Sequence, residues 1–193
     1  MMDLSDIKKV KQLVEACIKG ERKSQQKFYQ LFYGKLLSIC MRYADNREEA
    51  KDTLHDGFIK VFANLKEFGY RGSLEGWMKK IVTNTAIDAV RKKKIFFIEL
   101  GDNKNYDGIV DDYSENVEFE LCNQLKVETI IKLIQKLSPM YRTVLNLYIF
   151  EEMTHKKIAE ELNITIGTSK SNYAKAKRNL IKLFEDHKNG HKQ

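Results

Sequence analysis

Apolar residues recur at three- and four-residue steps along most of this chain, and convincing two-residue alternation is absent. This period is typical of amphipathic α-helices, whose buried side chains return to one face about every 3.6 residues. The pattern predicts helices over about residues 4–19, 24–43, 47–68, 74–93, 117–137, 139–150, 154–162 and 165–183, with a polar, frayed tail over 186–193. The sequence therefore predicts an all-α protein.

The segment from Thr154 to Leu183 has the pattern of a helix, a short turn and a second helix. Thr154 can cap the first helix, and Thr165 can cap the second. Asn163 falls at the turn, where asparagine tolerates a left-handed backbone better than most residues. One mostly apolar face of the second helix carries Ile166, Ser169, Tyr173, Ala176, Leu180 and Leu183. This arrangement predicts a helix-turn-helix.

The rest of that second helix is polar and cationic. Hydroxyls near a helix N-terminus, followed by cations, suit contacts with phosphates and base edges. The residues predicted to face DNA are Thr168, Lys170, Ser171, Asn172, Lys175 and Arg178. The alternative is a core helix with an ordinary solvated basic face.

Composition agrees with a helical protein that binds a polyanion. The 193 residues include 42% hydrophobic and 32% charged residues, and the net charge is +7. Three cysteines, Cys17, Cys40 and Cys122, have no metal-ligand or disulfide spacing and are interpreted as buried apolar residues in a reducing compartment. With no signal peptide or membrane span in the pattern, we expect a cytoplasmic protein that does not insert into membranes.

Two basic helical parts flank an acidic segment. Between Glu99 and Glu120 there are eight acidic residues and a single cation, Lys104. This predicts two small helical domains, 4–95 and 121–186, joined by a flexible acidic linker, 96–120. The linker is either a solubilising tether or an acidic strand that lies in a channel built for nucleic acid.

The helix over 47–68 carries a polar cluster, Asp52, His55 and Asp56. Such a cluster could bind a metal, but no second group of acids or histidines is found to complete the ligand shell. We therefore predict no metal or other cofactor and interpret the cluster as a charged docking face for another protein.

Next, a glycine-containing loop leads into a helix that Ser73 can cap. Trp77 lies on the core side of this helix, and cations and polar residues lie on its other side. An aromatic residue beside a flexible loop and cations suits the stacking of unpaired bases. A core tryptophan with a solvated basic helix end is the equally simple alternative.

In this order, these segments resemble a known family, the sigma factors of bacterial RNA polymerase. Residues 48–62, EEAKDTLHDGFIKVF, resemble the core-binding segment, and residues 70–94, YRGSLEGWMKKIVTNTAIDAVRKKK, resemble the promoter-melting segment. Residues 137–180 resemble the fourth conserved region, including its Gly-Thr-x-Lys-Ser start of the recognition helix. The likeness is to the short extracytoplasmic-function type, which keeps only the second and fourth regions.

The resemblance implies a role for each segment. Asp52, His55 and Asp56, with Phe58 beneath, would bind core RNA polymerase. The helix-turn-helix residues given above would read the minus-thirty-five element of promoter DNA. The minus-ten element would be recognised and melted by Arg71, Ser73, Leu74, Trp77, Lys80, Asn84, Asp88 and Arg91. Catalysis would belong to the polymerase, so the chain would not be an enzyme, and an anti-sigma factor is a further partner that the resemblance allows.

Two other classes of protein compete with this interpretation. A stand-alone helix-turn-helix regulator would bind an operator without polymerase, but it needs a dimer, and the sequence has no obvious dimerisation heptad. A metal-dependent nuclease would use Asp52, His55 and Asp56, and it lacks the second acidic cluster.

Overall fold

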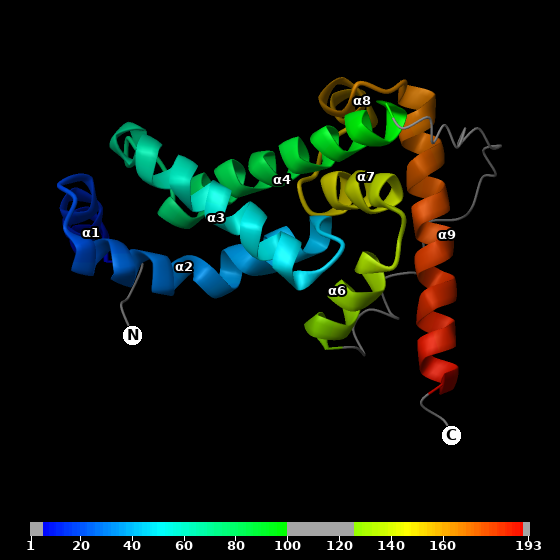
Figure 1. Cartoon of the computed structure of the whole chain (residues 1–193), viewed down its shortest axis with the longest axis horizontal. Coiled ribbons are helices and arrows are strands. Elements are labelled where there is room, and N and C mark those ends of the chain that lie inside the picture. The colour runs from blue at the N-terminus through cyan, green and yellow to red at the C-terminus, as the bar shows by residue number, and fades with distance from the viewer. Residues whose placement is uncertain (1–5, 100–125, 191–193) are drawn as a thin grey trace. The chain divides into compact units, whose positions relative to one another are not determined.

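The computed structural model describes residues 6–99 and 126–190 of the chain, and every regular element in those ranges is a helix. The prediction of an all-α fold is confirmed. The elements are α1 (Ile7–Ile18), α2 (Arg22–Tyr43), α3 (Arg47–Asn64), the short 3-10 helix η1 (Leu65–Glu67), α4 (Leu74–Glu99), α6 (Val127–Gln135), α7 (Pro139–Ile149), α8 (His155–Leu162) and α9 (Ile166–Gly190) (Figure 1). The predicted acidic linker lies almost wholly outside the described residues.

The chain forms two compact units. The first comprises Met1–Cys40 and Arg47–Ala86, and the second comprises Met41–Asn46 and Ile87–Gln193. The predicted domain boundaries, at 95 and 121, stay a prediction.

Local capping explains where several helices begin and end. The carboxylate of Asp6 accepts hydrogen bonds from the amides of Lys8 and Lys9, at 3.1 and 3.2 Å, and so starts α1. Gly20, with a φ of 81°, ends the same helix, as predicted. The Ser73 hydroxyl accepts a hydrogen bond from the Gly76 amide at 3.0 Å, which confirms Ser73 as the cap of α4.

Two helices run further than the sequence pattern predicts. α4 continues past Lys93 to Glu99, and α9 continues through the predicted frayed tail to Gly190. Apart from glycine, the added residues are ones that a helix tolerates, and no proline interrupts either extension. The helical backbone therefore continues after the amphipathic pattern has ended.

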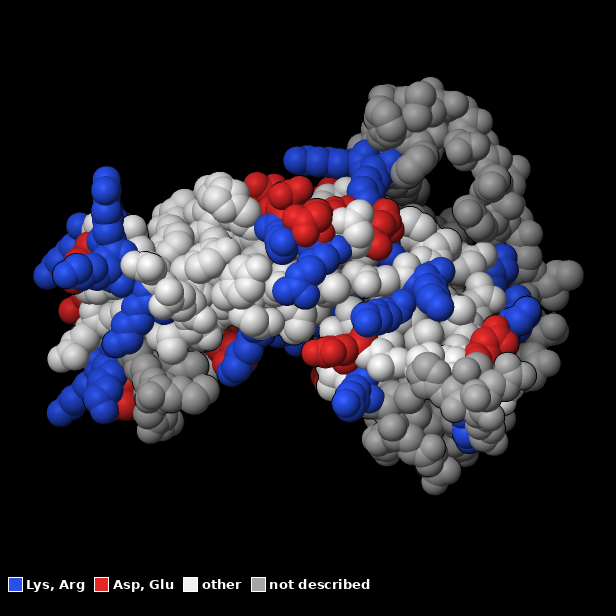
Figure 2. Space-filling model, turned by 60° about the horizontal axis from the view of Figure 1, so that its bottom comes forward, with Lys and Arg blue, Asp and Glu red and all other residues white. Residues whose placement is uncertain are grey.

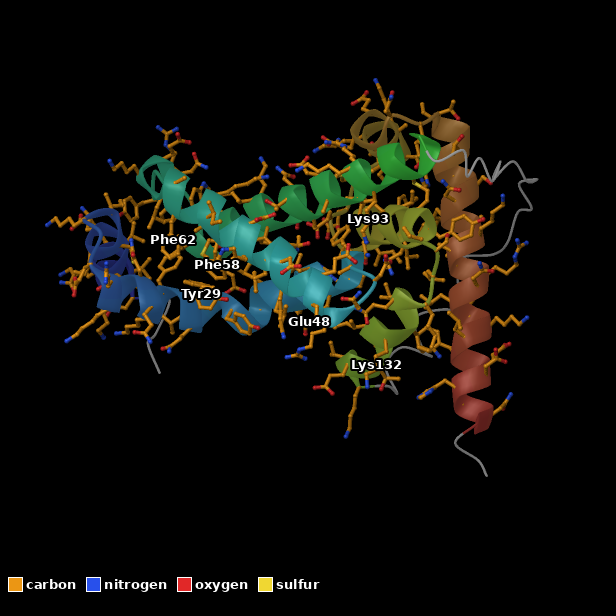
Figure 3. All side chains as sticks on the ribbon, viewed as in Figure 1. Tyr29, Glu48, Phe58, Phe62, Lys93 and Lys132 are labelled. Atoms are coloured by element: carbon orange, nitrogen blue, oxygen red, sulfur yellow. The ribbon has the colours of Figure 1, made fainter. Side chains whose placement is uncertain are left out.

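Aromatic packing holds α2 against α3 in the first unit. The rings of Tyr29 and Phe58 lie 4.4 Å apart between their centroids, and those of Phe28 and Phe62 lie 5.5 Å apart (Figure 3). Each such pair contributes about 0.5–1.5 kcal/mol beyond the area it buries. These contacts fix the helix that carries the predicted docking face.

A close approach of α3 to α4 depends on Gly57. A Cβ atom at Gly57 would meet Cγ2 of the buried Val82 at 3.0 Å, whereas one at Gly34, in the exposed part of α2, would meet nothing within 4 Å. We therefore expect Gly57→Ala to lower the free energy of unfolding by about 1–3 kcal/mol through overpacking. Gly34→Ala, as the matched control, should raise it by about 0.5–1 kcal/mol, because alanine is the better helix former. Urea unfolding of the two variants measures both changes in the free energy of unfolding. Equal stabilisation by the two substitutions would show that the Val82 side chain moves aside without cost.

Candidate nucleic-acid and polymerase interfaces

The helix-turn-helix forms as predicted. The Thr154 hydroxyl accepts a hydrogen bond from the Lys157 amide at 3.3 Å, and the Thr165 hydroxyl accepts one from the Thr168 amide at 3.0 Å. Asn163 lies between the helices in the left-handed conformation, with φ 51° and ψ 55°. Below the motif, α9 is anchored by a hydrophobic cluster of Ile134, Leu137, Leu145 and Ala176. The recognition helix is thus fixed at both its start and its middle.

The structure leaves five of the six predicted recognition-helix residues accessible. Lys170 and Arg178 are exposed, and Thr168, Ser171 and Lys175 are half-buried. Asn172 is only 1% exposed, so in this structure its side chain is packed, in contrast to the accessible position that the prediction requires. It lies roughly 60° around the helix from the fully buried Ser169, and it shares the packed side of α9 rather than the outer one.

Ile166 also differs from the prediction. The pattern assigned it to the apolar face of α9, yet it is 47% exposed in the first turn of the helix. Ile166 precedes the part of α9 that packs against other helices. It therefore stays exposed although the 3.6-residue repeat places it on the apolar face. An exposed apolar side chain there is suited to contact with the methyl group of thymine.

An aromatic cluster joins the start of α8 to α7 and α9. The His155 ring stacks on Tyr148, with centroids 4.6 Å apart, and it meets the edge of Tyr173 at 5.7 Å. Its Nδ1 atom lies 3.0 Å from the buried Ser169 hydroxyl. Partial burial, and then the nearby Lys170 ammonium, hold the pKa of His155 below its ordinary value. The neutral imidazole is therefore the form that fits this packing.

The packing of His155 predicts a pH dependence. The unfolded chain binds a proton at this ring more readily than the folded unit, so stability must fall as the pH drops through about 6.5. We expect the free energy of unfolding, measured in urea at several pH values, to fall less steeply for His155→Phe than for the original chain. Ser169→Ala, the control, should lose the hydrogen bond at every pH and keep the original slope. Identical slopes for His155→Phe and the original chain would contradict the assignment.

The predicted minus-ten residues divide into exposed and packed positions. Arg71, Ser73, Lys80 and Asn84 are exposed, and Trp77, Asp88 and Arg91 are half-buried. Arg91 forms two ion pairs, with Asp88 along α4 at 3.4 Å and with Glu161 at 2.7 Å. Leu74 is only 6% exposed, so in this structure its side chain is packed, in contrast to the base-contacting position that was predicted. As the first residue of α4, it turns into the core and helps to anchor the loop.

Tyr70 is the aromatic residue that the sequence analysis missed in this loop. It is 40% exposed and has a φ of 55°, which a tyrosine rarely adopts. Its ring lies 5.0 Å from that of Phe68, which lies 5.5 Å from Trp77. Burial, and then the charge of Glu15, raise the pKa of Tyr70. The available signal was an aromatic residue between Gly69 and Gly72 and directly before Arg71.

The predicted docking face lies on the outside of α3. Asp52, His55 and Asp56 are exposed, while Phe58 is buried beneath them against Tyr29. Phe58 therefore packs beneath this face, as the sequence predicts. Ile59, which the analysis did not single out, is 55% exposed beside the acidic residues.

Among the described residues, 6–99 and 126–190, no three His, Cys, Asp or Glu side chains gather as metal ligands. No helix of this part of the chain combines the length and the apolar character that a membrane span needs.

Comparison with known proteins identifies the family. Residues 28–95 match the family described as Sigma-70 region 2, and residues 128–180 match Sigma-70, region 4. The chain is 30% identical over 187 residues to the ECF RNA polymerase sigma factor SigW of Bacillus subtilis (strain 168), covering 92% of this chain and 97% of SigW. It is 28% identical over 170 residues to the RNA polymerase sigma factor YlaC of the same organism, covering 86% and 96% of the two chains. A solved structure, the sigma factor RpoE with the anti-sigma factor NepR from Bartonella quintana, aligns with a TM-score of 0.47 and 19% identity, over 83% of this chain and 96% of that one.

The chain therefore belongs to the sigma-70 family of RNA polymerase sigma factors. Within that family it is an extracytoplasmic-function sigma factor, as its motifs predicted, and its function is to direct RNA polymerase to promoters.

Proposed function

We propose that three separate surfaces of this sigma factor divide the work of promoter recognition. The outer face of α3 binds core RNA polymerase, the 68–73 loop with α4 recognises and melts the minus-ten element, and α9 reads the minus-thirty-five element. The observation that carries this proposal is that α4 and α9 each expose polar and cationic side chains, while one face of α3 exposes Asp52, His55 and Asp56. A protein with a single binding face would not need surfaces of different charge on three helices.

For polymerase binding, Asp52, His55 and Asp56 supply the charged part of the contact. Ile59 lies three residues after Asp56, so it is a neighbour on the same face of α3. An exposed isoleucine among charged residues can act as a small apolar anchor in the interface. The surrounding polar contacts then fix the orientation of the two proteins.

For promoter melting, the flipped base needs a stacking surface and cations for its phosphates. Tyr70 supplies the exposed ring, and Arg71, Lys80 and Arg91 supply cations. Ser73, Trp77 and Asn84 belong to the same loop and helix, and Arg91 pairs with Asp88 at 3.4 Å and with Glu161 at 2.7 Å. Base flipping costs a few kcal/mol, and these stacking and phosphate contacts offset it.

For reading the duplex, the accessible residues of α9 are those that enter the major groove. We retain Thr168, Lys170, Ser171, Lys175 and Arg178, and replace the buried Asn172 by Ile166 at the start of the helix. Cations there bind phosphates and guanine, and Ile166 contacts thymine methyl groups.

We further infer that this chain makes and breaks no covalent bond and that it works in the cytoplasm, where its polymerase partner is found. An anti-sigma factor as partner, and the passage of the acidic linker through the polymerase's nucleic-acid channel, stay predictions.

The test is transcription in vitro. The purified chain is added to bacterial core polymerase on a promoter library, and the transcripts are sequenced. We expect new start sites that require both components and share two upstream elements. Silence in this assay, together with tight duplex binding by the chain alone, would support the operator-binding regulator instead.

A further inference from the structure

A cationic surface covers one end of the first unit, around α1, the start of α2 and the 65–71 segment. Figure 2 shows lysine and arginine side chains gathered at the end of this unit where α1 lies. We call this surface the α1 patch. Its exposed members are Lys8, Lys11, Lys19, Arg22, Lys23, Lys66 and Arg71.

The charge of this end is concentrated and largely unpaired. Residues 6–27 and 65–71 contain nine Lys or Arg and four Asp or Glu, a formal charge of +5 in a chain of +7. Lys11 lies 3.9 Å from Glu15, a loose pair. Five cations of the patch form no ion pair within the described part of the chain: Lys19, Arg22, Lys23, Lys66 and Arg71.

The positions of Arg22 and Lys23 carry an electrostatic cost. They occupy the first turn of α2, which contains no acidic residue, so they lie beside the positive end of the helix dipole. Folding alone would favour acids there. A bound polyanion would offset both the dipole and the clustered cations.

The α1 patch is continuous with the loop proposed to hold an unpaired base. The Lys11 ammonium lies 6.0 Å from the centroid of the Tyr70 ring, within the range of a cation–π contact. Lys66 and Arg71 flank that ring in the sequence, and η1 packs against α1. An exposed ring bordered by cations is the general design of surfaces that bind single-stranded nucleic acid.

We propose that the α1 patch binds the phosphates of single-stranded promoter DNA that continues from the bases held at Tyr70. The occupant is a single strand rather than a duplex, because the exposed part of the Tyr70 ring can stack only on an unpaired base. Four acids, Asp6, Glu15, Glu21 and Glu67, lie in the same segments and leave their balance at +5. This inference rests on the proposed function and extends it to α1 and to the start of α2.

The test compares two variants in the holoenzyme, that is, the full chain with core polymerase. The patch variant is Lys19→Gln/Arg22→Gln/Lys23→Gln. The matched control is Lys126→Gln/Lys132→Gln/Lys136→Gln, which removes the same charge from exposed positions in the second unit. Two DNA probes share the promoter duplex and a melted minus-ten element, and one carries ten further single-stranded nucleotides. Dissociation constants are measured for both probes over a range of salt concentrations.

We expect the longer probe to bind more tightly to the original holoenzyme and to the control. The patch variant should lose most of that gain, roughly tenfold, and its salt slope on the longer probe should fall by about 2, or 0.7 for each phosphate contact. Equal weakening on both probes would overturn the single-strand assignment in favour of duplex or polymerase contact. If the patch variant kept the full gain in affinity for the longer probe, the α1 patch would be a solvated surface that does not bind DNA. Absence of promoter-dependent binding by the original holoenzyme would instead overturn the proposed function.

Discussion

The double substitution Asp52→Lys/Asp56→Lys should abolish association of the chain with core polymerase while its helical content is preserved. Both carboxylates are exposed on α3 at i and i+4, and neither forms an ion pair within the described residues. Their contribution to folding is therefore small, and the added repulsion along α3 costs only a few tenths of a kcal/mol per pair. At the interface, by contrast, like charges opposed to each other cost several kcal/mol.

Co-elution of the purified chain with core polymerase measures this effect, and circular dichroism checks the fold. The matched control is Glu185→Lys/Asp186→Lys, an equal reversal on exposed positions near the end of α9. It should co-elute as the original chain does. Retained association by the α3 variant would remove this face from the polymerase contact, whatever the transcription assay shows.

The features that the sequence predicts correctly are those decided by a few neighbouring residues. The caps at Thr154 and Ser73 depend on one hydroxyl and an amide three residues later. The left-handed positions at Gly20 and Asn163 follow from residues that adopt positive φ at little cost. Local chemistry of this kind is fully present in the sequence.

The features that it misses depend on tertiary packing near the ends of helices. Leu74, Ile166 and Asn172 each fit a helical period, but whether a neighbouring element covers them cannot be obtained from that period. Leu74 and Asn172 are covered and Ile166 is not. The helical period therefore predicts which helices form, and it does not decide the burial of these three side chains.

The backbone conformation of Tyr70 also could not be predicted from the sequence pattern. In a segment that contains Gly69 and Gly72, the glycines are the expected sites of positive φ, yet Tyr70 adopts it. The packing of its ring on Phe68, and Phe68 in turn on Trp77, compensates a conformation that costs about 1–2 kcal/mol. Such compensation is visible only once the three rings are placed together.

Replacing Tyr70 by glycine should therefore separate stability from promoter melting. Glycine relieves the left-handed strain, about 1–2 kcal/mol, but loses the aromatic contact, about 0.5–1.5 kcal/mol, and the partial burial of the ring, about 1–2 kcal/mol, so the free energy of unfolding should fall by about 2 kcal/mol or less. Loss of base stacking, about 1–3 kcal/mol for each base, should reduce open-complex formation roughly tenfold or more. Permanganate reactivity of unpaired thymines in the holoenzyme–promoter complex measures that loss.

Tyr70→Phe is the control that keeps the ring, and it should melt the promoter as the original chain does. The defect of Tyr70→Gly should persist on a premelted promoter, because the stacking surface binds the base after it leaves the duplex. Normal melting by the glycine variant would assign Tyr70 to covering Phe68 alone. A defect that disappears on premelted DNA would instead place the residue at the step of duplex opening, since a stacking partner is needed just as much once the strands are apart.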